Sequence, residues 1–530
     1  MSLLSANEWR VAEAIAGIGY VNPFLPERIE LEKQALGKDF VHFQPFLQYR
    51  PDCAVSDMFP NVPALCLRCG QLLVKMRAKL IAQTPATERE LEVYENLVLY
   101  QLYERYMSNI QVLPAVKFCT RPVRDILDCY VSFVKDFQQF LVLPERKLPS
   151  NLDQDIIFAG LFQIERAFFH IFSNIVGPSM AAARLRAAIW QSIFTHDMRC
   201  YMRSLYRYMG DVPTLITGPS GTGKELVAQS IAYSRFVKFD SQKGAFVANF
   251  ADSFVGLNLT AIAPTLIESE LFGHVKGAFT DATDRIGFLD ESKCPQWGTV
   301  LLDEIGDLDA NIQVKLLRVL QSRDYQRVGD SQTRKFVGKI IAATNQDLAA
   351  EMEAGRFRED FYYRLCADRI ETPSLRAQLE ESPDNIVNFV RFIATRKLPN
   401  TPTEASRLTD QVVSWIAHKL GPDYAWRGNI RELEQCVTSI MIRGSYVPAR
   451  RQSSLERSRK TAFLADVEAG VLDRERLLSG YFSLVHAKTG SYRAAGRQLG
   501  VDWRTVKGIV DAQSALLSTP EQLDSTNCRP

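Results

Sequence analysis

Gly218-Pro219-Ser220-Gly221-Thr222-Gly223-Lys224-Glu225 is the stretch that decides the fold of this chain. It follows a short apolar run, residues 214–217, and precedes residues 225–234, where apolar residues recur at helical spacing. Glycines in this context let backbone N–H groups turn toward phosphate oxygens, and the helix N-terminus adds partial positive charge. Lys224 is placed to reach the β- and γ-phosphates of a nucleotide. Gly-rich turns before helices are also common where nothing binds. The downstream sequence therefore has to distinguish a phosphate-binding loop from an ordinary turn.

A second segment, residues 298–304, supplies the acids that such a site needs. Its apolar strand ends in Asp303 and Glu304. We expect Asp303 to hold Mg²⁺, directly or through water, and Glu304 to orient and deprotonate the attacking water. Two acids at a strand end are common on solvated surfaces, but these lie downstream of a phosphate loop. Asn345 follows another strand and is a weaker candidate for binding the water or the γ-phosphate, because Asn often begins a turn.

Length and composition describe an ordinary globular chain. It has 530 residues, 46% hydrophobic and 23% charged, with a net charge of +2. Any contact with nucleic acid must therefore come from a local patch. No apolar run approaches the ~18 residues that span a bilayer, and the N-terminus lacks the order of a signal peptide. Ten scattered cysteines argue against a disulfide framework. We expect a cytoplasmic protein without membrane contact.

The sequence pattern divides the chain into six parts. Residues 1–176 are predicted to form a largely helical regulatory region, with helices near residues 88–106 and 156–176. Residues 177–372 alternate strands, near 212–217, 299–302 and 339–343, with helices, which indicates a parallel sheet buried on both faces. Residues 373–445 are predicted to be a helical lid, 446–470 a charged linker, 471–515 a last helical unit and 516–530 a tail.

Cys66 and Cys69 have the spacing of a zinc knuckle, and Cys53 and His42 are further candidate ligands. A structural zinc site usually needs two such pairs, and the sequence offers one. We therefore favour buried thiols over a metal site.

Together these residues resemble the AAA+ ATPase domain of bacterial enhancer-binding proteins, the activators of sigma-54 RNA polymerase, from about residue 177 to 443. The family's phosphate loop also has Glu after Lys, so Glu225 fits where other loops have Ser or Thr. Residues 268–282 resemble the family's signature surface loop, 355–365 its arginine-finger segment and 426–433 its second sensor. The resemblance implies a multidomain fold with an α/β AAA+ core and a helical lid, and it implies ATP and Mg²⁺ as ligands.

The resemblance also implies roles for single residues. Arg358 and Arg364 would reach the nucleotide of the next subunit, and Arg431 would sense nucleotide from the lid. Asn258 falls where the family holds its catalytic Glu, although residues 241–251 look like an insertion before it. If each subunit supplies arginines to the nucleotide of its neighbour, the two subunits must meet through different faces. Such a heterologous interface closes into a ring, and the family forms hexamers. The sigma-factor contact would be the tip of the signature loop: Gly277, Ala278, Phe279, Thr280, Asp281 and Ala282.

Asp281 departs from the family pattern, which has Gly at that position. Asp tolerates the left-handed region better than most residues, so we expect the backbone turn to be kept. In a hexamer, six carboxylates would then lie near the ring axis, beside Phe279 and Thr280. We expect ordinary ATPase activity with weakened or altered coupling to sigma-54.

Residues 491–510 are predicted to form a helix-turn-helix. Gly500 allows the tight turn, and Asp502 is a candidate N-cap. Residues 488–507 include five basic residues and one acid, which suits contact with phosphates. The unit resembles the Fis-type DNA-binding domain; a hairpin used for dimerisation is the alternative. Its predicted core is Ala494, Ala495, Leu499, Val501, Val506 and Ile509. Its predicted DNA-binding residues are Arg493, Arg497, Trp503, Arg504, Thr505 and Lys507.

These features predict an AAA+ ATPase that binds DNA upstream of a promoter and uses ATP hydrolysis to remodel sigma-54 RNA polymerase. The N-terminal region, which does not resemble the receiver domain often found there, would be the regulatory input. The alternative is a DNA-binding AAA+ regulator or scaffold that no longer couples to sigma-54. Phe279 and Thr280 favour the first interpretation, and Asp281 favours the second.

Overall fold

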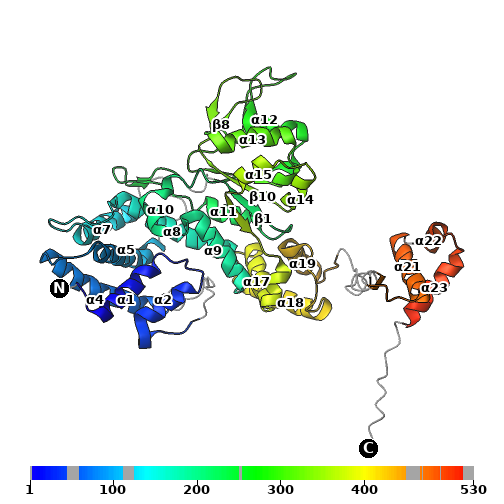
Figure 1. The fold of residues 1–530 in the computed structure, drawn as a ribbon, viewed down its shortest axis with the longest axis horizontal. Helices are drawn as coiled ribbons and strands as arrows, with labels where there is room; N and C mark the ends of the chain where they lie inside the picture. The colour runs from blue at the N-terminus through cyan, green and yellow to red at the C-terminus, as the bar shows by residue number, and fades with distance from the viewer. Residues whose placement is uncertain are drawn as a thin grey trace, which may run out of the picture. The chain divides into compact units, whose positions relative to one another are not determined.

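The computed structural model describes residues 3–43, 59–111, 124–249, 254–448, 466–467, 469–489 and 491–516. The chain forms two compact units that divide between Ser445 and Tyr446. The first unit contains the N-terminal helices, the α/β core and the lid, and the described part of the second contains the helices α21, α22 and α23 (Figure 1).

A five-stranded parallel sheet forms the centre of the first unit, which confirms the predicted α/β fold. The strand order is β11-β1-β10-β7-β4. The strands are β1 (Thr214–Thr217), β4 (Phe254–Asn258), β7 (Thr299–Asp303), β10 (Lys339–Thr344) and β11 (Asp368–Glu371). Because all neighbouring pairs are parallel, the carboxyl ends of the strands meet at one edge, where ligands bind in open α/β sheets.

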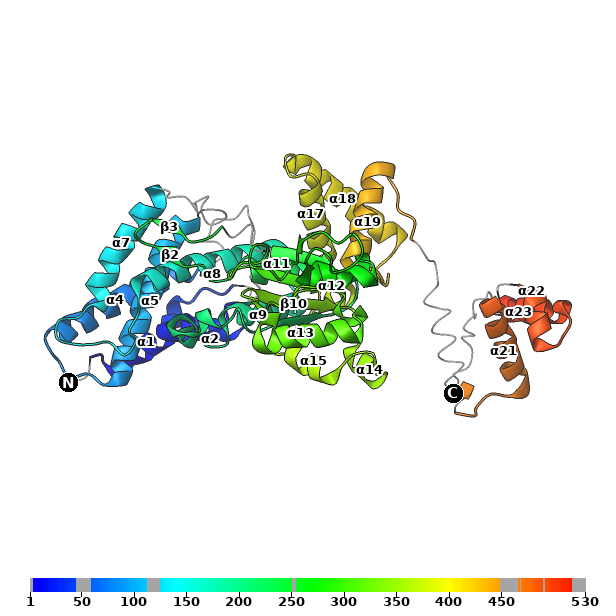
Figure 2. The same ribbon diagram turned by 90° about the horizontal axis from the view of Figure 1, so that it is seen from above.

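Alternate residues of the central strands pack on opposite faces of the sheet. Ile216 and Ile341 pack with α9 and α11 on one face. Leu215 and Ala342 pack with α13 and α15 on the other. The flanking helices are α9 (Met180–Phe194), α11 (Lys224–Ala232), α13 (Ala310–Ser322) and α15 (Glu359–Leu365). Figure 2 shows α11 and α13 on the two sides of β10. Burial on both faces explains the continuous apolar runs of these strands.

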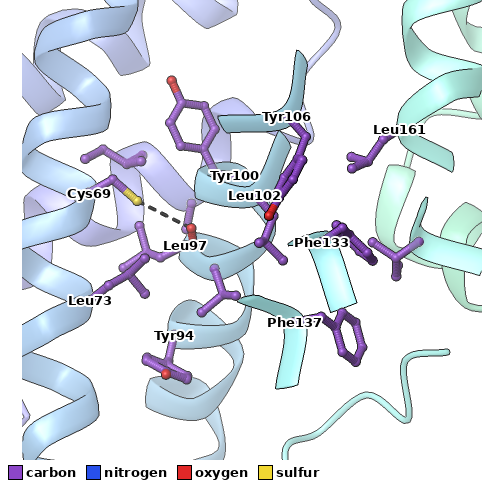
Figure 3. Close-up of a cluster of buried hydrophobic side chains, with 14 of the residues drawn as sticks. Cys69, Leu73, Tyr94, Leu97, Tyr100, Leu102, Tyr106, Phe133, Phe137 and Leu161 are labelled. Carbon is purple, nitrogen blue, oxygen red and sulfur yellow. Dashed lines mark hydrogen bonds between the residues drawn. The ribbon is translucent and has the colours of Figure 1, made fainter. Parts of the chain in front are cut away.

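The N-terminal region is helical, as the sequence predicts. Its longer helices are α1 (Ala6–Ile18), α2 (Glu27–Leu36), α4 (Val62–Ile81), α5 (Glu88–Gln111), α7 (Arg124–Leu141) and α8 (Gln154–Asn174). A capping box begins α1, where Ser5 Oγ accepts from the backbone N–H of Glu8 and the Glu8 carboxylate accepts from that of Ser5. Apolar faces of these helices share one core (Figure 3), in which Leu97 of α5 lies with Leu73 of α4 and Phe133 of α7.

Among the described residues, one helix is long and apolar enough to cross a membrane by length and composition alone. This helix, α8, has a mean hydropathy of 1.3 over its 18-residue window, and 67% of that window is buried inside the protein. It escapes a search for uninterrupted apolar runs because Glu165 and Arg166 lie within it. Phe158 and Phe162 belong to the N-terminal core, and Ile171 packs in the core beneath the sheet. Burial on several sides accounts for the composition of α8.

A β-hairpin after α11, whose second strand lies within the predicted insertion of residues 241–251, joins the α/β core to the N-terminal helices. Its strands, β2 (Phe239–Asp240) and β3 (Ala245–Phe246), pair antiparallel. The Phe239 ring packs on Phe158 of α8 at 5.0 Å between centroids, and Phe246 packs on Phe162 at 5.1 Å. Figure 2 shows the hairpin beside α8. Residues 250 and 251, the end of the predicted insertion, lie outside the described residues.

The predicted lid is a bundle of four helices. They are α16 (Leu375–Glu381), α17 (Asn385–Lys397), α18 (Pro402–Lys419) and α19 (Asn429–Arg443). Thr372, just after β11, hydrogen-bonds the carbonyl of Thr217 through its backbone N–H at 2.8 Å. This bond fixes the start of the lid beside the end of β1.

Cys66 and Cys69 lie one turn apart on α4. Cys69 is fully buried and donates from Sγ to the carbonyl of Leu97 at 3.4 Å. Burial raises the pKa of the Cys66 thiol to about 12, and zinc binds the thiolate form. Cys53 lies outside the described residues. Within them, no group of three His, Cys, Asp or Glu side chains could hold a metal ion.

Candidate functional site

The glycine loop joins β1 to α11 at the carboxyl edge of the sheet. Gly218, Gly221 and Gly223 have φ of 145°, 77° and 91°, a region that favours glycine. A Cβ on Gly218 would lie 2.2 Å from Oγ1 of Thr372, and one on Gly221 would lie 2.3 Å from the carbonyl oxygen of Gly428. Both positions therefore require glycine, because any side chain would collide with neighbouring chain.

The remaining residues of the loop fix its shape. Thr222 Oγ1 donates to the carbonyl of Pro219 at 2.8 Å and lies 2.7 Å from the Thr372 hydroxyl. Pro219 and Ser220 are exposed, and so is Glu225 in the first turn of α11. Glu225 accepts from Gln229 at 3.3 Å. The loop is thus held by its own hydrogen bonds and by the lid.

Lys224 is the buried cation of the site. Its side chain is folded onto the loop, where Nζ donates to the carbonyls of Gly218 at 2.9 Å and Pro219 at 3.3 Å. Burial lowers the pKa of Lys224, and the charges of Glu304 and Asp303 act in the opposite direction. The lysine therefore lies within electrostatic reach of both acids that the sequence predicts for this site.

The carboxyl end of β7 supplies these acids. Glu304 has φ of 58°, a left-handed conformation uncommon for a residue with a side chain, and its N–H donates to Asp303 Oδ1 at 3.1 Å. Asn345, just after β10, donates to Glu304 through its backbone N–H at 3.3 Å and through Nδ2 at 3.1 Å. The structure therefore brings together Lys224, Asp303, Glu304 and Asn345, and Asn345 fixes the carboxylate of Glu304.

The side chain of Asn258 does not hydrogen-bond Glu304. Asn258 ends β4 in register with Asp303. Its Oδ1 accepts from the backbone N–H groups of Thr260 at 3.0 Å and Ala261 at 3.2 Å. Asn258 thus caps the short helical turn that follows it, and Asn345 makes the contact with Glu304 instead.

Three consecutive residues at the start of α19 attach the lid to the loop. Asn429 Nδ2 donates to the carbonyl of Ser220 at 2.9 Å, and its Oδ1 accepts from the N–H of Leu375 at 2.9 Å. The N–H of Ile430 donates to the carbonyl of Gly221 at 2.9 Å. Arg431, the predicted sensor, is exposed and donates to Ser220 Oγ at 3.2 Å. Sequence analysis did not select Asn429, whose φ of 53° is tolerated best by Gly and Asn.

The two predicted arginine fingers lie at the surface of α15. Arg358, the N-cap residue, pairs with Asp360 at 2.8 Å. Arg364 is exposed and forms no ion pair within the described parts of the chain. Neither arginine forms a hydrogen bond or an ion pair with the glycine loop of its own chain.

The predicted signature loop, residues 268–282, begins at the end of α12 (Pro264–Phe272) and continues into the tip of a second β-hairpin. Its strands are β5 (Gly273–His274) and β6 (Arg285–Ile286), paired antiparallel. Hydrogen bonds close the tip, from the N–H of Gly277 to the carbonyl of Ala282 at 3.1 Å and from the N–H of Ala282 to the carbonyl of Phe279 at 3.0 Å. Phe279 is 48% exposed although its ring contacts His274 at 4.8 Å. The tip thus presents an aromatic side chain to solvent, with Ala278 and Thr280 beside it.

Asp281 keeps the predicted turn. Its φ is 60°, so the left-handed conformation expected for the family's Gly is retained, and its carboxylate is exposed. Ala282, the next residue, is 6% exposed and anchors the tip. The substitution therefore changes the charge of the tip and leaves its backbone turn in place.

The described part of the second unit has helices on both sides of the turn at Gly500. Its helices are α21 (Arg474–Thr489), α22 (Tyr492–Leu499) and α23 (Trp503–Leu516). Gly500 has φ of 68°, and Asp502 Oδ1 accepts from the N–H of Arg504 at 2.8 Å as an N-cap. Ala495 and Val506 are fully buried, as predicted. Val501 is 36% exposed, so its prediction as a core residue is wrong: Phe482 and Val485 of α21 occupy the core instead.

The predicted DNA-binding side chains lie on α22 and at the start of α23. Arg493, Arg497, Arg504, Thr505 and Lys507 are exposed. The guanidinium groups of Arg493 and Arg504 lie 6.0 and 5.3 Å from the centroid of Trp503. This surface is therefore basic and has an aromatic ring between two arginines.

Known proteins match the region that contains the glycine loop and the two acids at the end of β7. The family described as "Sigma-54 interaction domain" matches residues 195–371. Transcriptional regulatory protein ZraR of Salmonella typhimurium is 38% identical over 303 residues, which cover 56% of this chain and 62% of that protein. Nif-specific regulatory protein of Enterobacter agglomerans is 41% identical over 233 residues, 44% of this chain and 40% of that protein.

A solved structure of NtrX from Brucella abortus in complex with ADP is 22% identical, with a TM-score of 0.38, and covers 72% of this chain and 80% of its own. The chain spans less than two thirds of the length of the curated relatives it matches. Residues 195–371 of this chain are thus similar to the sigma-54 interaction domain.

Proposed function

We propose that this protein binds DNA upstream of a promoter and uses ATP hydrolysis to remodel sigma-54 RNA polymerase. The observation that supports the proposal most is that one domain combines two features. Lys224, Asp303, Glu304 and Asn345 meet at one sheet edge, and the hairpin tip of the same domain exposes Phe279. The first feature suits nucleotide hydrolysis, and the second suits contact with a protein.

ATP is the substrate that fits the first feature. The glycine loop offers backbone N–H groups and the N-terminus of α11 to phosphate oxygens, and Lys224 adds a cation. Asp303 would hold Mg²⁺, which neutralises phosphate charge when bound. Glu304 would take a proton from the attacking water. Its two hydrogen bonds from Asn345 keep the carboxylate oriented before the reaction.

A closed ring, a hexamer as in the resembling family, follows from the surface position of Arg358 and Arg364. Neither arginine bonds to the loop of its own chain, and a neighbouring subunit would receive both at its nucleotide. The interface would join two different faces of the subunit, which is the heterologous kind that closes into rings. The ring would bring the Phe279 tips of its subunits together at the surface that meets sigma-54.

DNA binding is assigned to the second unit. Five basic residues and one acid within residues 488–507, on a helix-turn-helix with a capped second helix, suit phosphate contacts and groove entry. A protein with this role would work in the cytoplasm, where the polymerase and its template are.

The direct test of coupling compares Phe279→Ala with Ile286→Ala, which truncates an exposed apolar residue at the base of the same hairpin. ATP turnover and opening of a sigma-54 promoter by permanganate footprinting are measured together. We expect Phe279→Ala to hydrolyse ATP and fail to open the promoter, and Ile286→Ala to do both. If Phe279→Ala opens the promoter as wild type does, the proposal is wrong. If wild-type protein hydrolyses ATP and binds DNA but opens no such promoter, the uncoupled regulator is the correct interpretation.

A further inference from the structure

A small cavity lies at the amino edge of the sheet, opposite the glycine loop, where Lys339 begins β10. It has a volume of about 30 Å³, and one water molecule needs roughly 10–15 Å³. The cavity therefore has room for one small ion or for water, and not for a larger ligand. Its polar lining residues come from α8, α9, β10, α10 (Met198–Arg203) and the segments after α10 and α11: Gln163, Ser192, Tyr201, Tyr206, Arg235 and Lys339.

Lys339 brings a buried positive charge to this cavity. It is 2% exposed, and its Nζ donates to the carbonyls of Val212 at 2.6 Å and Met209 at 3.4 Å. An ammonium has three N–H groups, so one of them has no acceptor among the described residues. Lys339 forms no ion pair with a described carboxylate either. A buried charge without an opposite charge costs free energy.

Arg235 brings a second positive charge. It is partly buried, its Nη1 donates to the carbonyl of Gly298, and it has no ion pair within the described part of the chain. Burial lowers the pKa of Lys339, and the positive charges of Arg235 and Arg323 lower it further. The two cations that line the cavity therefore repel each other.

The nearby acids do not neutralise these cations. Asp368 favours the charged form of Lys339, but its Oδ2 accepts from Ser192 Oγ at 2.5 Å and from Thr214 Oγ1 at 2.9 Å. Asp211 pairs with Arg323 at 2.7 Å. The cluster thus has one more positive than negative charge: Lys339, Arg235 and Arg323 against Asp211 and Asp368.

We propose that this cavity binds one monatomic anion of the size of chloride, held by the Lys339 ammonium and the Arg235 guanidinium. The anion accepts the third N–H of Lys339 and neutralises the excess charge, whereas a water molecule does only the first. The volume of the cavity excludes phosphate, sulfate and carboxylates. An anion beside the ammonium also favours its charged form, which opposes the effect of burial.

The anion would connect the N-terminal helices to the ATPase core. The cavity is lined both by Gln163 of α8 and Tyr201 of α10 and by Lys339 of β10. Asn345 follows the other end of β10, so the residues assigned to ATP hydrolysis lie at the opposite edge of the sheet. Binding of the anion therefore does not depend on the proposed function, and it is measured without nucleotide.

The test measures urea unfolding of the full-length protein at mildly acidic pH, where the lysine is charged. Sodium chloride replaces sodium gluconate stepwise at constant ionic strength, because gluconate is too large for the cavity. A ligand that binds only the folded state lowers the equilibrium constant for unfolding by the factor 1 + [ligand]/Kd. We expect a saturable binding isotherm of this form, about tenfold when chloride reaches roughly ten times its Kd, and the same behaviour with bromide. Equal unfolding in chloride and gluconate would overturn the proposal.

Three variants locate the site. Lys339→Met removes the ammonium and should reduce the effect of chloride to nearly onefold. Arg235→Gln should weaken the effect severalfold, and it carries the test if Lys339→Met does not fold. Lys335→Met removes a lysine whose side chain is 66% exposed, outside the cavity, and should keep the full effect. A full effect of chloride in Lys339→Met, or its loss in Lys335→Met, would show that the assignment is wrong.

Bromide also gives a direct measurement, because it scatters X-rays anomalously. Crystals of the full-length protein grown in sodium bromide should show an anomalous peak in contact with Lys339 Nζ, and crystals of Lys339→Met should not. A water molecule at that position without an anomalous signal would overturn the proposal.

Discussion

Asn429→Ala should release the lid from the glycine loop. The side chain accepts from the buried N–H of Leu375 and donates to the carbonyl of Ser220. Loss of a partner for a buried N–H costs about 1–3 kcal/mol, and water replaces the Ser220 contact at little cost, because Ser220 is exposed. The φ of 53° adds roughly 1 kcal/mol for alanine. A total near 3 kcal/mol corresponds to a shift of roughly 100-fold in the docking equilibrium of the lid.

Two measurements follow this change. Hydrogen exchange of the lid amides near Leu375 should become faster by about the same factor in Asn429→Ala, while exchange in β7 and β10 stays unchanged. Affinity for a fluorescent ATP analogue should fall, because Ser220 and Gly221 of the loop lose their contacts with α19. Asn429→Gly should lose the side-chain contacts without the alanine strain and should therefore fall between wild type and alanine.

Asn388→Ala is the matched control. Asn388 lies on α17 of the same lid, and its side chain only weakly contacts the carbonyl of Asp384, at 3.5 Å. We expect wild-type exchange and nucleotide affinity for this variant. If Asn429→Ala matches Asn388→Ala in both measurements, the lid is not held by Asn429 and the energetic reasoning above is wrong.

Three further predictions concern the hairpin tip, the DNA-binding unit and a buried lysine. Asp281→Gly keeps a turn with φ of 60° and removes one carboxylate per subunit, so it should raise open-complex formation at an unchanged rate of ATP turnover; a decrease would show that Asp281 is an adapted contact. Arg504→Ala should weaken DNA binding and lower the slope of log affinity against log salt by about 0.9, whereas Arg476→Ala on α21 should leave both unchanged; equal effects would argue against α23 as the DNA reader. Burial lowers the pKa of Lys339 to about 7, whereas lysine in an unfolded chain titrates near ~10.4. The folded state then binds fewer protons between these pH values, so the free energy of unfolding should rise with pH from 7 to 9 by at most about 1.4 kcal/mol per unit. Lys339→Met should remove this rise. The free energy of unfolding is measured by urea titration at several pH values, and the same dependence on pH in the two proteins would contradict the prediction.

The sequence was sufficient for the parts of the fold that are buried on two sides. β1, β7 and β10 are central strands, and continuous apolar runs identify such strands without knowledge of their neighbours. β4 and β11 were not predicted as strands, because each of these two edge strands has a single buried residue, Leu257 in β4 and Ile370 in β11. An edge strand is defined by the neighbour with which it pairs, and that pairing is a property of the folded chain.

The residues of the candidate site also divide into those that the sequence predicts and those that depend on the folded chain. Lys224, Asp303 and Glu304 could be predicted because each lies at a fixed distance from a strand end. Asn429 could not, because its role depends on a contact with Ser220 across 209 residues of sequence. Val501 was misplaced for a related reason: α21, outside the two predicted helices, fills the core of the unit with Phe482 and Val485.

The central claim is that Glu304 converts ATP binding into work on sigma-54 RNA polymerase. Glu304→Gln keeps the size of the side chain and its contact with Asn345, and it removes the base. The decisive measurement is promoter opening by this variant, with ATP binding confirmed on the same sample. The account predicts bound ATP, nearly abolished turnover and no open complex. Turnover and promoter opening close to wild type would contradict it.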